Sequence, residues 1–389
     1  MDSSSVFMYV SSWAPLKENG VSGLDVYLFD CGNGALSHVS RVLEGTNCNM
    51  SFADEDRHML YVLDEAKKLP ALRAGGGGRV LAFRLNPETG IPSEAGATAT
   101  FCPQPSFAAL DATGEYMVVA NHSSTSVVCK AVKDAFGEVR LEVLCDDSLI
   151  DLFSMNTDGT IKKLVDVAYH YGSGPKHFHP RPHSAVRSPS GKLFAVCDKG
   201  NDKIYFYQID REKQMLKLSA APYQDTPGSS PRYCVFHPSL PYLFVNHEGN
   251  TVIESFRYDE DGTLTFISAV EICPAGAGAA WDKAEQQGLT ISSDGTYIYD
   301  LIHGPDVVAV LQVDEAEGTL SVKQLQPASG KWLRGCALSP DGAFLVTACV
   351  TDGVIEVFRV APDGTLNPTG FRAEQPAAAY ITFYSAGRL

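Results

Sequence analysis

Histidine and arginine side chains recur at corresponding places in a repeated sequence pattern, and these residue types can bind and transform a small anion. His183, Arg232 and Arg334 each stand at or next to the start of a predicted strand that runs into a tight turn. Arginine can hold a carboxylate or phosphate through two hydrogen bonds, and histidine can move protons near neutral pH. The pattern therefore predicts a site for a small anionic substrate.

The strands that must position these residues form two alternating repeat units. One unit is an apolar strand, a tight turn and a second apolar strand, as in FAALDATGEYMVVAN from Phe107 and HSAVRSPSGKLFAVCD from His183, and it recurs six times. The other is a β-rich strand running into an acidic or glycine turn, as in IESFRYDEDGTL and IEVFRVAPDGTL, and it recurs seven times if the weaker VVCKAVKDAFGEV is included. Glycine supplies the positive φ that such turns need.

Seven units of the second kind and six of the first leave one repeat incomplete. The strands VFMYVSSW, from Val6 to Trp13, and AAYITFY, near Tyr380 to Tyr384, can complete it from the two chain ends. Four antiparallel strands in each repeat of about fifty residues are typical of a propeller blade. We predict one all-β domain over residues 1–389, a seven-bladed β-propeller whose last blade is shared by both termini. Residues 141–182 interrupt the pattern and are expected to form an elaborated inter-blade loop.

In a propeller, the start of each innermost strand and the loop joining the second and third strands lie on the same face of the disc. Residues at these places should meet at one mouth of the central channel. The polar candidates after the second strands are Glu65, Asn121, His122, Asp198, Lys199, His247, Glu248 and His303. We predict His183, Arg232, His247 and His303 as catalytic residues, and substrate contacts from Arg181, Arg334, Glu248, Asn121, His122, Asp198 and Glu65.

Composition limits the partners. The net charge of −15 argues against binding nucleic acid or an anionic membrane, because both require a basic surface. The N-terminus lacks the pattern of a secretory signal, and the ten cysteines include no C-x-x-C pair, so we expect a cytoplasmic protein with reduced thiols. The sequence leaves the oligomeric state open.

A metal site is an alternative use of His177, His179 and His183, because H-x-H spacing on a strand places two imidazoles on one side. The first two lie in a proline-rich stretch with no cysteine or carboxylate at ligand spacing nearby. We therefore expect no cofactor, and a bound metal only as the less favoured alternative.

These residues and motifs resemble the lactonase family of seven-bladed propellers, whose members include 6-phosphogluconolactonases and carboxy-muconate cyclases. The resemblance covers nearly the whole chain and is strongest in HSAVRSPSGKLFAVCDKGNDKIYFYQI, SPRYCVFHPSLPYLFVN and LRGCALSPDGAFLVT. It implies a site made of a histidine, an arginine, a glutamate and a second arginine.

The histidine and the first arginine of that family site match His183 and Arg232. The position of the family glutamate falls on His247, with Glu248 one residue later, and that of the second arginine falls on His303. The family's Pro-His-x-His reads Pro180, Arg181, Pro182 and His183 in this chain.

Three functions follow as hypotheses. The first is an enzyme that opens or forms a small carboxylated or sugar-derived lactone, with His183 activating water while Arg232, helped by Arg334 or Arg181, holds the acid group or the oxyanion. The second is a lyase, isomerase or epimerase that uses His183, His247 and His303 as acid and base. The third is a noncatalytic binding propeller, which predicts a broad apolar patch in place of a narrow polar pocket.

Overall fold

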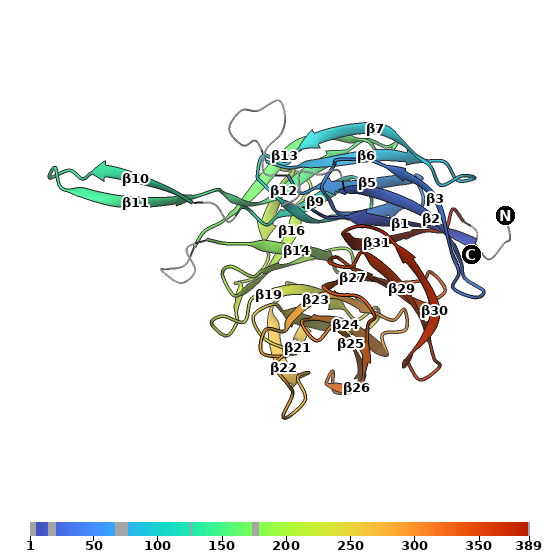
Figure 1. Cartoon of the computed structure of the whole chain (residues 1–389). Coiled ribbons are helices and arrows are strands. Elements are labelled where there is room, and N and C mark those ends of the chain that lie inside the picture. The colour runs from blue at the N-terminus through green and yellow to red at the C-terminus, as the bar shows by residue number, and fades with distance from the viewer. Residues whose placement is uncertain (1–4, 15–20, 67–76, 125–126, 173–178, 388–389) are drawn as a thin grey trace.

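The chain forms a seven-bladed β-propeller, as the repeat pattern predicts (Figure 1). The computed structural model describes residues 5–14, 21–66, 77–124, 127–172 and 179–387. All regular elements in these residues are strands, numbered β1 to β31, and their blades are antiparallel sheets. In the described part of the chain, no helix has the length and apolarity needed to cross a membrane.

Five blades are built from consecutive strands, each blade starting with its innermost strand. Blade 2 contains β4 (Cys48–Asp54), β5 (Met59–Asp64), β6 (Arg79–Leu85) and β7 (Pro92–Ala99). Blade 4 contains β14 (Pro182–Arg187), β15 (Phe194–Asp198), β16 (Lys203–Asp210) and β17 (Met215–Leu218), with the short β18 (Tyr223–Gln224) also paired to β16. Blade 5 contains β19 (Pro231–Phe236), β20 (Tyr242–His247), β21 (Val252–Tyr258) and β22 (Leu264–Glu271). Blade 6 contains β23 (Glu285–Ile291), β24 (Tyr297–His303), β25 (Val307–Val313) and β26 (Leu320–Pro327). Blade 7 contains β27 (Leu333–Leu338), β28 (Phe344–Cys349), β29 (Val354–Val360) and β30 (Leu366–Glu374).

Blade 1 closes the ring with strands from both ends of the chain. Its innermost strand is the C-terminal β31 (Ala378–Tyr384), which pairs with the N-terminal β1 (Ser5–Ser12). The outer strands are β2 (Gly23–Asp30) and β3 (Leu36–Val42). Figure 1 shows the blue and red ends of the chain side by side. The predicted closure by both termini is therefore confirmed.

Blade 3 differs from the prediction. Its strands are β8 (Pro105–Leu110), β9 (Tyr116–Asn121), β12 (Ser148–Met155) and β13 (Ile161–His170). The interval 141–182, predicted as an inter-blade loop, thus contains the two outer strands of this blade. The segment VVCKAVKDAFGEV, predicted as a blade hairpin, belongs to an inserted hairpin of β10 (Val127–Lys133) and β11 (Val139–Cys145).

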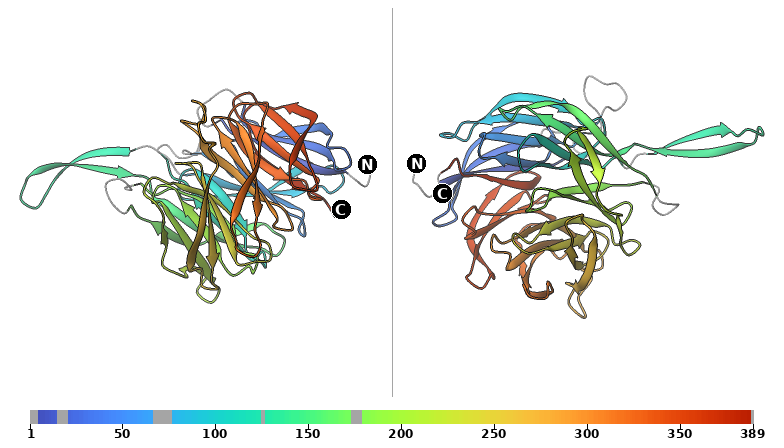
Figure 2. Two further views of the ribbon diagram at one scale, coloured as in Figure 1. Left: turned by 90° about the horizontal axis from the view of Figure 1, so that it is seen from below. Right: turned by 180° about the vertical axis from the view of Figure 1, so that it is seen from behind.

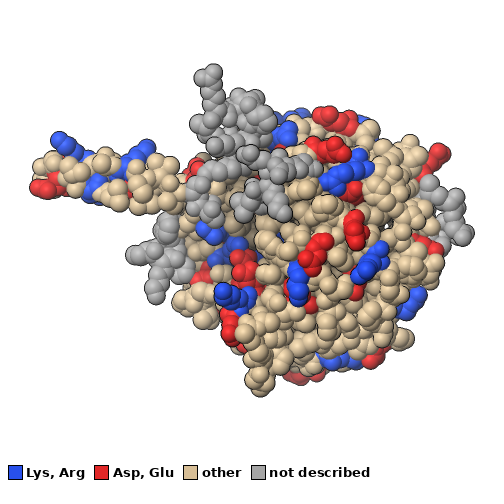
Figure 3. Space-filling model, in the orientation of Figure 1, with Lys and Arg blue, Asp and Glu red and all other residues tan. Residues whose placement is uncertain are grey.

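The inserted hairpin projects from the body of the propeller (Figures 1, 2 and 3). Its register places Val127, Cys129 and Ala131 opposite Cys145, Val143 and Leu141, so these apolar side chains share one face of the two-stranded sheet. Leu141 is 68% exposed. This face is an apolar surface held away from the core of the propeller.

Tyrosines on second strands lock neighbouring blades together. Tyr9 of β1 donates a hydrogen bond to the carbonyl of Gly90 in blade 2 (2.7 Å), and Tyr61 of β5 donates to that of Gly159 in blade 3 (2.6 Å). Tyr299 of β24 donates to Gly364 of blade 7 (3.1 Å). The three glycines have φ between 68° and 83°, the conformation expected of glycine in the outer hairpin turns. Each turn thus also anchors the preceding blade.

Candidate active site

A bulge near the start of the innermost strand recurs in blades 2 to 7. The pairing register shifts between Cys48 and Ser51, Pro105 and Phe107, Pro182 and Ser184, Pro231 and Tyr233, Gln286 and Leu289, and Leu333 and Gly335. A bulge leaves a residue unpaired and redirects its side chain. The cavity-lining residues found within these shifts are Asn49, Ser106, His183, Arg232, Gln287 and Arg334. The repeated bulge is therefore the device that turns one side chain of each blade toward a shared cavity.

A second series comes from the residue that directly follows the second strand. In blades 1 to 5 these residues are Trp13, Glu65, His122, Lys199 and Glu248. All five line the same cavity as the bulge residues, together with Gln104, Glu285 and Trp332. The cavity has a volume of about 240 Å³. The two series place side chains from every blade around one small polar chamber, which suits a small polar ligand.

Three charged side chains form a partly buried ion cluster on one wall of the cavity. Lys199 Nζ lies 2.8 and 2.7 Å from the two carboxylate oxygens of Glu248, and Arg232 Nε lies 2.9 Å from Oε2. Burial would raise the pKa of Glu248, but the nearby Lys199 and Arg232 lower it to about 2. Glu248 is therefore an ionised carboxylate shared by two cations.

Glu65, Trp13, Arg334 and Asn49 form a second group of cavity residues. The indole of Trp13 donates a hydrogen bond to Glu65 Oε2 (2.7 Å), and the Arg334 guanidinium lies 3.8 Å from the centre of a Trp13 ring. Arg334 Nη2 donates to Asn49 Oδ1 (3.0 Å). Burial raises the pKa of Glu65 to about 7, although the charge of Arg334 acts in the opposite direction. Glu65 can thus exchange a proton near neutral pH.

His183 is a neutral imidazole in this chamber. Its side chain is buried, and Nδ1 has no hydrogen-bond partner among the described residues. The ring meets His122 and Tyr233 edge to face, at centroid distances of 5.5 and 4.9 Å. Burial, followed by the charges of Arg232 and Lys199, lowers the pKa of His183 well below its ordinary value. His183 therefore offers an unprotonated ring to a ligand.

A buried polar network supports Arg232 from behind. Gln286 donates from Nε2 to Asp300 (2.8 Å), while its Oε1 accepts the backbone N–H of His247 (2.7 Å). Asn246 donates to the other oxygen of Asp300 (2.7 Å), and the Gln286 carbonyl accepts from Arg232 Nη1 (3.5 Å). Linked hydrogen bonds of this kind hold the guanidinium in place.

The structure brings six of the predicted site residues into the cavity and leaves five outside its lining. The six are His183, Arg232, Arg334, Glu248, His122 and Glu65. Four of the others, Asn121, Asp198, His247 and His303, are each the last residue of a second strand. Neighbouring strand residues point to opposite sides, so the next residue along is the one that reaches the cavity in blades 3, 4 and 5.

The residues that end the second strands make other contacts. Asn121 donates to Asp151 (3.0 Å), and Asp198 pairs with His170 (2.7 Å). His303 stacks on Trp332, which itself lines the cavity, at a centroid distance of 5.5 Å. Arg181 precedes β14, and its backbone N–H donates to Asp198 (2.7 Å). His247 belongs to a separate buried cluster. Neither His247, at the position of the family glutamate, nor His303, at that of the second arginine, lines the cavity.

The histidine-rich stretch is divided between two places. His177 lies outside the described residues. His179 Nε2 contacts the Ser123 hydroxyl (3.0 Å), whereas His183 lines the cavity.

The sequence-based prediction missed Trp13, Asn49, Gln104, Ser106, Glu285, Gln287 and Trp332, and it named Lys199 as a candidate at the channel mouth without giving it a substrate contact. Position in the repeat was the available signal for Asn49 and Ser106, which occupy the place of His183 in blades 2 and 3, and for Lys199, which occupies that of Glu248. Trp332 and Gln104 lie just before an innermost strand and carried no comparable signal.

Comparisons with known proteins agree with this architecture. The family model described as "Lactonase, 7-bladed beta-propeller" matches residues 7–383. The 6-phosphogluconolactonase of Bacillus subtilis is 22% identical over 352 residues, which cover 90% of each protein. The 6-phosphogluconolactonase of an Enterobacter species is 24% identical over 272 residues, covering 69% of this chain and 71% of that protein.

Solved structures show the same fold. The periplasmic gluconolactonase of Pseudomonas aeruginosa aligns with a TM-score of 0.83 at 23% identity, over 98% of this chain and 99% of that one. Since the family model spans almost all of the sequence, the chain belongs to the lactonase family of seven-bladed β-propeller enzymes.

Proposed function

We propose that the protein hydrolyses a sugar-derived lactone that carries an anionic group, and that the reaction takes place in the cavity lined by His183, Arg232 and Glu65. The observation that carries this proposal is the charge of the chamber. Lys199, Arg232 and Arg334 supply three cations. The lining carboxylates are Glu248, whose pKa is lowered to about 2, Glu65, whose pKa is raised to about 7, and the exposed Glu285. A phosphate or carboxylate of the substrate can pair with the Arg232 guanidinium.

The names of the relatives support the reaction type. Two of them are called 6-phosphogluconolactonase, and one solved neighbour is called a gluconolactonase. A lactone is a cyclic ester, and water opens it by adding to the carbonyl carbon. The ester C–O bond then breaks, and the ring oxygen leaves as the hydroxyl of a hydroxy acid. Arg334 is suited to stabilise the negative charge that develops on the carbonyl oxygen, and Arg232 is suited to bind the anionic group of the substrate.

Glu65 is the proposed acceptor of the proton from water. A base works best when its pKa lies near the working pH, and the pKa of Glu65 is raised to about 7 by burial. His183 is a weaker base because burial and the neighbouring cations lower its pKa. Its unpartnered Nδ1 is suited to hold the attacking water. This division of roles refines the expectation that His183 itself takes the proton.

The alternatives receive less support. The imidazole-based lyase, isomerase or epimerase needs His247 and His303 beside His183, and neither lines the cavity. The binding propeller predicts a broad apolar patch in place of a polar pocket, whereas the chamber is small and charged.

A cytoplasmic location is part of the proposal, supported by ten cysteines that are all free thiols.

The experiment compares a charged and a neutral lactone, 6-phosphogluconolactone and gluconolactone, with the wild type and Arg232→Gln. We expect kcat/KM for the phosphorylated lactone to fall at least 100-fold in the variant, and that for the neutral lactone to fall less than tenfold. Arg84→Gln, which removes an exposed ion pair with Asp158, is the matched control and should retain both rates. Equal losses for the two lactones, or no hydrolysis of either by the wild type, would contradict the proposal.

A further inference from the structure

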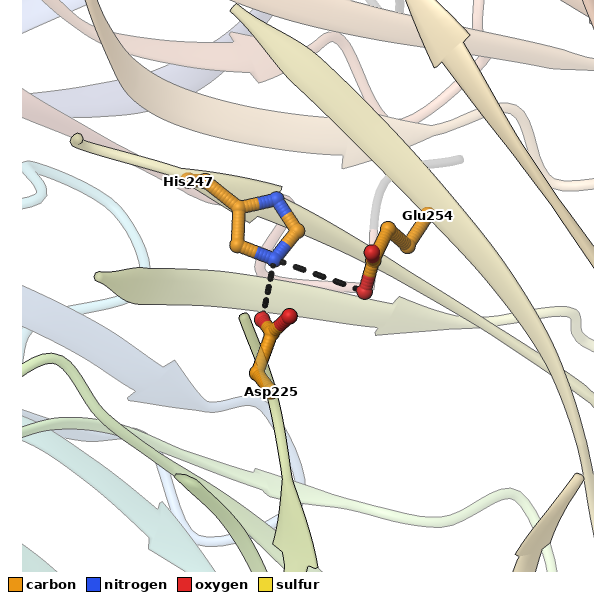
Figure 4. A group of neighbouring side chains, drawn as sticks. All are labelled: Asp225, His247 and Glu254. Carbon is orange, nitrogen blue, oxygen red and sulfur yellow. Dashed lines mark hydrogen bonds and ion pairs between the residues drawn. The ribbon is translucent and has the colours of Figure 1, made fainter. Parts of the chain in front are cut away.

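Asp225, His247 and Glu254 converge at a buried point between blades 4 and 5 (Figure 4). His247 ends β20, Glu254 lies on β21, and Asp225 follows the short strand β18 of the preceding blade. His247 Nε2 lies 2.8 Å from Asp225 Oδ2 and 3.7 Å from Glu254 Oε2. One donor atom from each residue lies within 4.8 Å of those of the other two. None of the three lines the proposed active-site cavity.

The contact of the second ring nitrogen of His247 shows which of the two nitrogens carries a hydrogen. Nδ1 lies 2.9 Å from the carbonyl oxygen of Val252, and a carbonyl only accepts, so Nδ1 carries a hydrogen. In the neutral ring, Nε2 then has a lone pair aimed at two carboxylates. That arrangement requires either a second proton on the ring or a cation between the three side chains. A histidine that donates one N–H to a carbonyl and offers the other nitrogen to a metal is a common ligand arrangement.

The junction of blades 3 and 4 offers an internal comparison, because a related histidine–aspartate pair lies at the corresponding place there. Asp198 ends β15 as His247 ends β20, and it contacts His170 Nδ1 at 2.7 Å. There the other nitrogen, Nε2, contacts the hydroxyl of Tyr207 at 3.0 Å. Tyr205 occupies the position that Glu254 has in blade 5, since each pairs with the valine two residues before the end of the second strand. Blade 5 therefore has an additional carboxylate where blade 4 has an aromatic ring.

One oxygen of the additional carboxylate accepts no hydrogen bond from the described residues. Glu254 Oε2 is buried and accepts no hydrogen bond from any described residue. The side chains of Asp225 and His247 are each only 1% exposed. The Glu254 side chain is 13% exposed. Two carboxylates beside a single imidazole leave an excess of negative charge, which is costly where water is largely excluded. A divalent cation would balance the charge of both carboxylates and would be coordinated by Glu254 Oε2.

We propose that Asp225, His247 and Glu254 bind a divalent transition-metal ion of the Zn²⁺ type. One imidazole nitrogen and two carboxylate oxygens are suitable ligands for Zn²⁺. Zinc–ligand bonds of about 2.1 Å in tetrahedral geometry separate the donor atoms by about 3.4 Å. The separations of 2.8 and 3.7 Å from His247 Nε2 bracket that value. The ion would join blade 4 to blade 5 immediately beside Glu248 of the active-site cavity.

The test is calorimetric titration of the full chain, freed of metal with a chelator and dialysed, with Zn²⁺ and separately with Ca²⁺. We expect one Zn²⁺ per chain and at least 100-fold weaker binding of Ca²⁺, which prefers sites made only of oxygen ligands. Glu254→Gln should weaken Zn²⁺ binding at least tenfold. Tyr205→Phe, at the corresponding position of blade 4, is the matched control and should bind Zn²⁺ as the wild type does.

A wild-type chain that binds no Zn²⁺ in stoichiometric amount would overturn the proposal and leave a buried imidazolium between two carboxylates. Unchanged affinity in Glu254→Gln would also overturn it, because the ion would then sit elsewhere. If that variant does not fold, anomalous scattering at the zinc edge from wild-type crystals soaked in Zn²⁺ decides the question. A peak between the three side chains supports the site, and a peak only elsewhere or none refutes it.

Discussion

Replacing Glu248 with glutamine should destabilise the protein in a manner that depends on pH. Lys199 and Arg232 contact the carboxylate and, against the effect of burial, lower its pKa from 4.5 to about 2. That difference corresponds to roughly 3 kcal/mol of folding free energy, at about 1.4 kcal/mol for each tenfold change in proton affinity. The value is an upper bound, because the Glu248 side chain is 26% exposed and water screens part of the interaction.

The sign of the pH dependence follows from the direction of the shift. The folded state holds the proton of Glu248 less tightly than the unfolded state does, so ionised Glu248 stabilises the fold fully above about pH 4.5. This stabilisation is lost as the pH falls toward 2, and roughly 1 kcal/mol of it remains at pH 3. Glu248→Gln should therefore be less stable than the wild type by up to about 3 kcal/mol at pH 7 and by no more than about 1 kcal/mol at pH 3.

Urea unfolding at the two pH values, followed by tryptophan fluorescence, measures the difference. Glu94→Gln on the exposed face of β7 is the control, and it should change the unfolding free energy by less than about 0.5 kcal/mol. Added phosphate should stabilise Glu248→Gln more than the wild type, because an anion can replace the missing carboxylate between Lys199 and Arg232. A difference of under about 1 kcal/mol at pH 7, or one that is the same at pH 3, would refute this account of the ion cluster.

Three further predictions concern the proton acceptor, the hairpin and the closing strand. Because burial raises the pKa of Glu65 to about 7 and its ionised form is the base, kcat/KM for the lactone should rise with pH through about 7 in the wild type, and Glu65→Gln should lose that limb; a limb kept in the variant would assign it to another group. Replacing residues 127–145 with a short glycine–serine linker should change the free energy of unfolding by less than about 1 kcal/mol, because β10 and β11 project from the core, and a larger loss in urea titration would mean that the hairpin supports the blade. A chain ending at Glu374 lacks β31 and its fully buried Tyr384, so its thermal unfolding should lose cooperativity in calorimetry, and a sharp transition near that of the wild type would argue against closure by this strand.

The propeller could be predicted from local pattern because each blade repeats the same strand periodicity and the same glycine turns. The error in blade 3 has a physical reason. The inserted hairpin follows the same local rules as a blade hairpin, with strands around an acidic glycine-containing turn, so sequence alone does not separate the two. The true third strand, SLIDLFSM, is buried on both faces and includes Asp151, whose partner Asn121 lies on another strand. A long-range hydrogen bond of that kind leaves no signal in the local pattern.

Sequence position placed the candidate residues on one face, and six of the eleven predicted site residues line the cavity. His183, Arg232 and Arg334 were found because the bulge occurs at the same place in each repeat. His247 and His303 were preferred for their chemistry, yet the residue that follows the second strand is the one that faces the cavity in blades 1 to 5. A strand side chain reverses direction at each residue, so an uncertainty of one position in a strand end moves a residue from the cavity into the sheet.

The strand that closes the ring follows every other described strand in the chain, so it is synthesised after them. Val10 pairs with Ile381, so the inner edge of β1 has no partner strand until β31 has been synthesised. The entropic cost of joining such distant segments grows only slowly with chain length, by about 0.6 kcal/mol for each doubling. The large separation therefore delays folding of the first blade but lowers the stability of the folded protein little. A nascent or prematurely terminated chain presents that edge to other strands, where it invites aggregation. Synthesis of β31 is thus the event that protects the first blade.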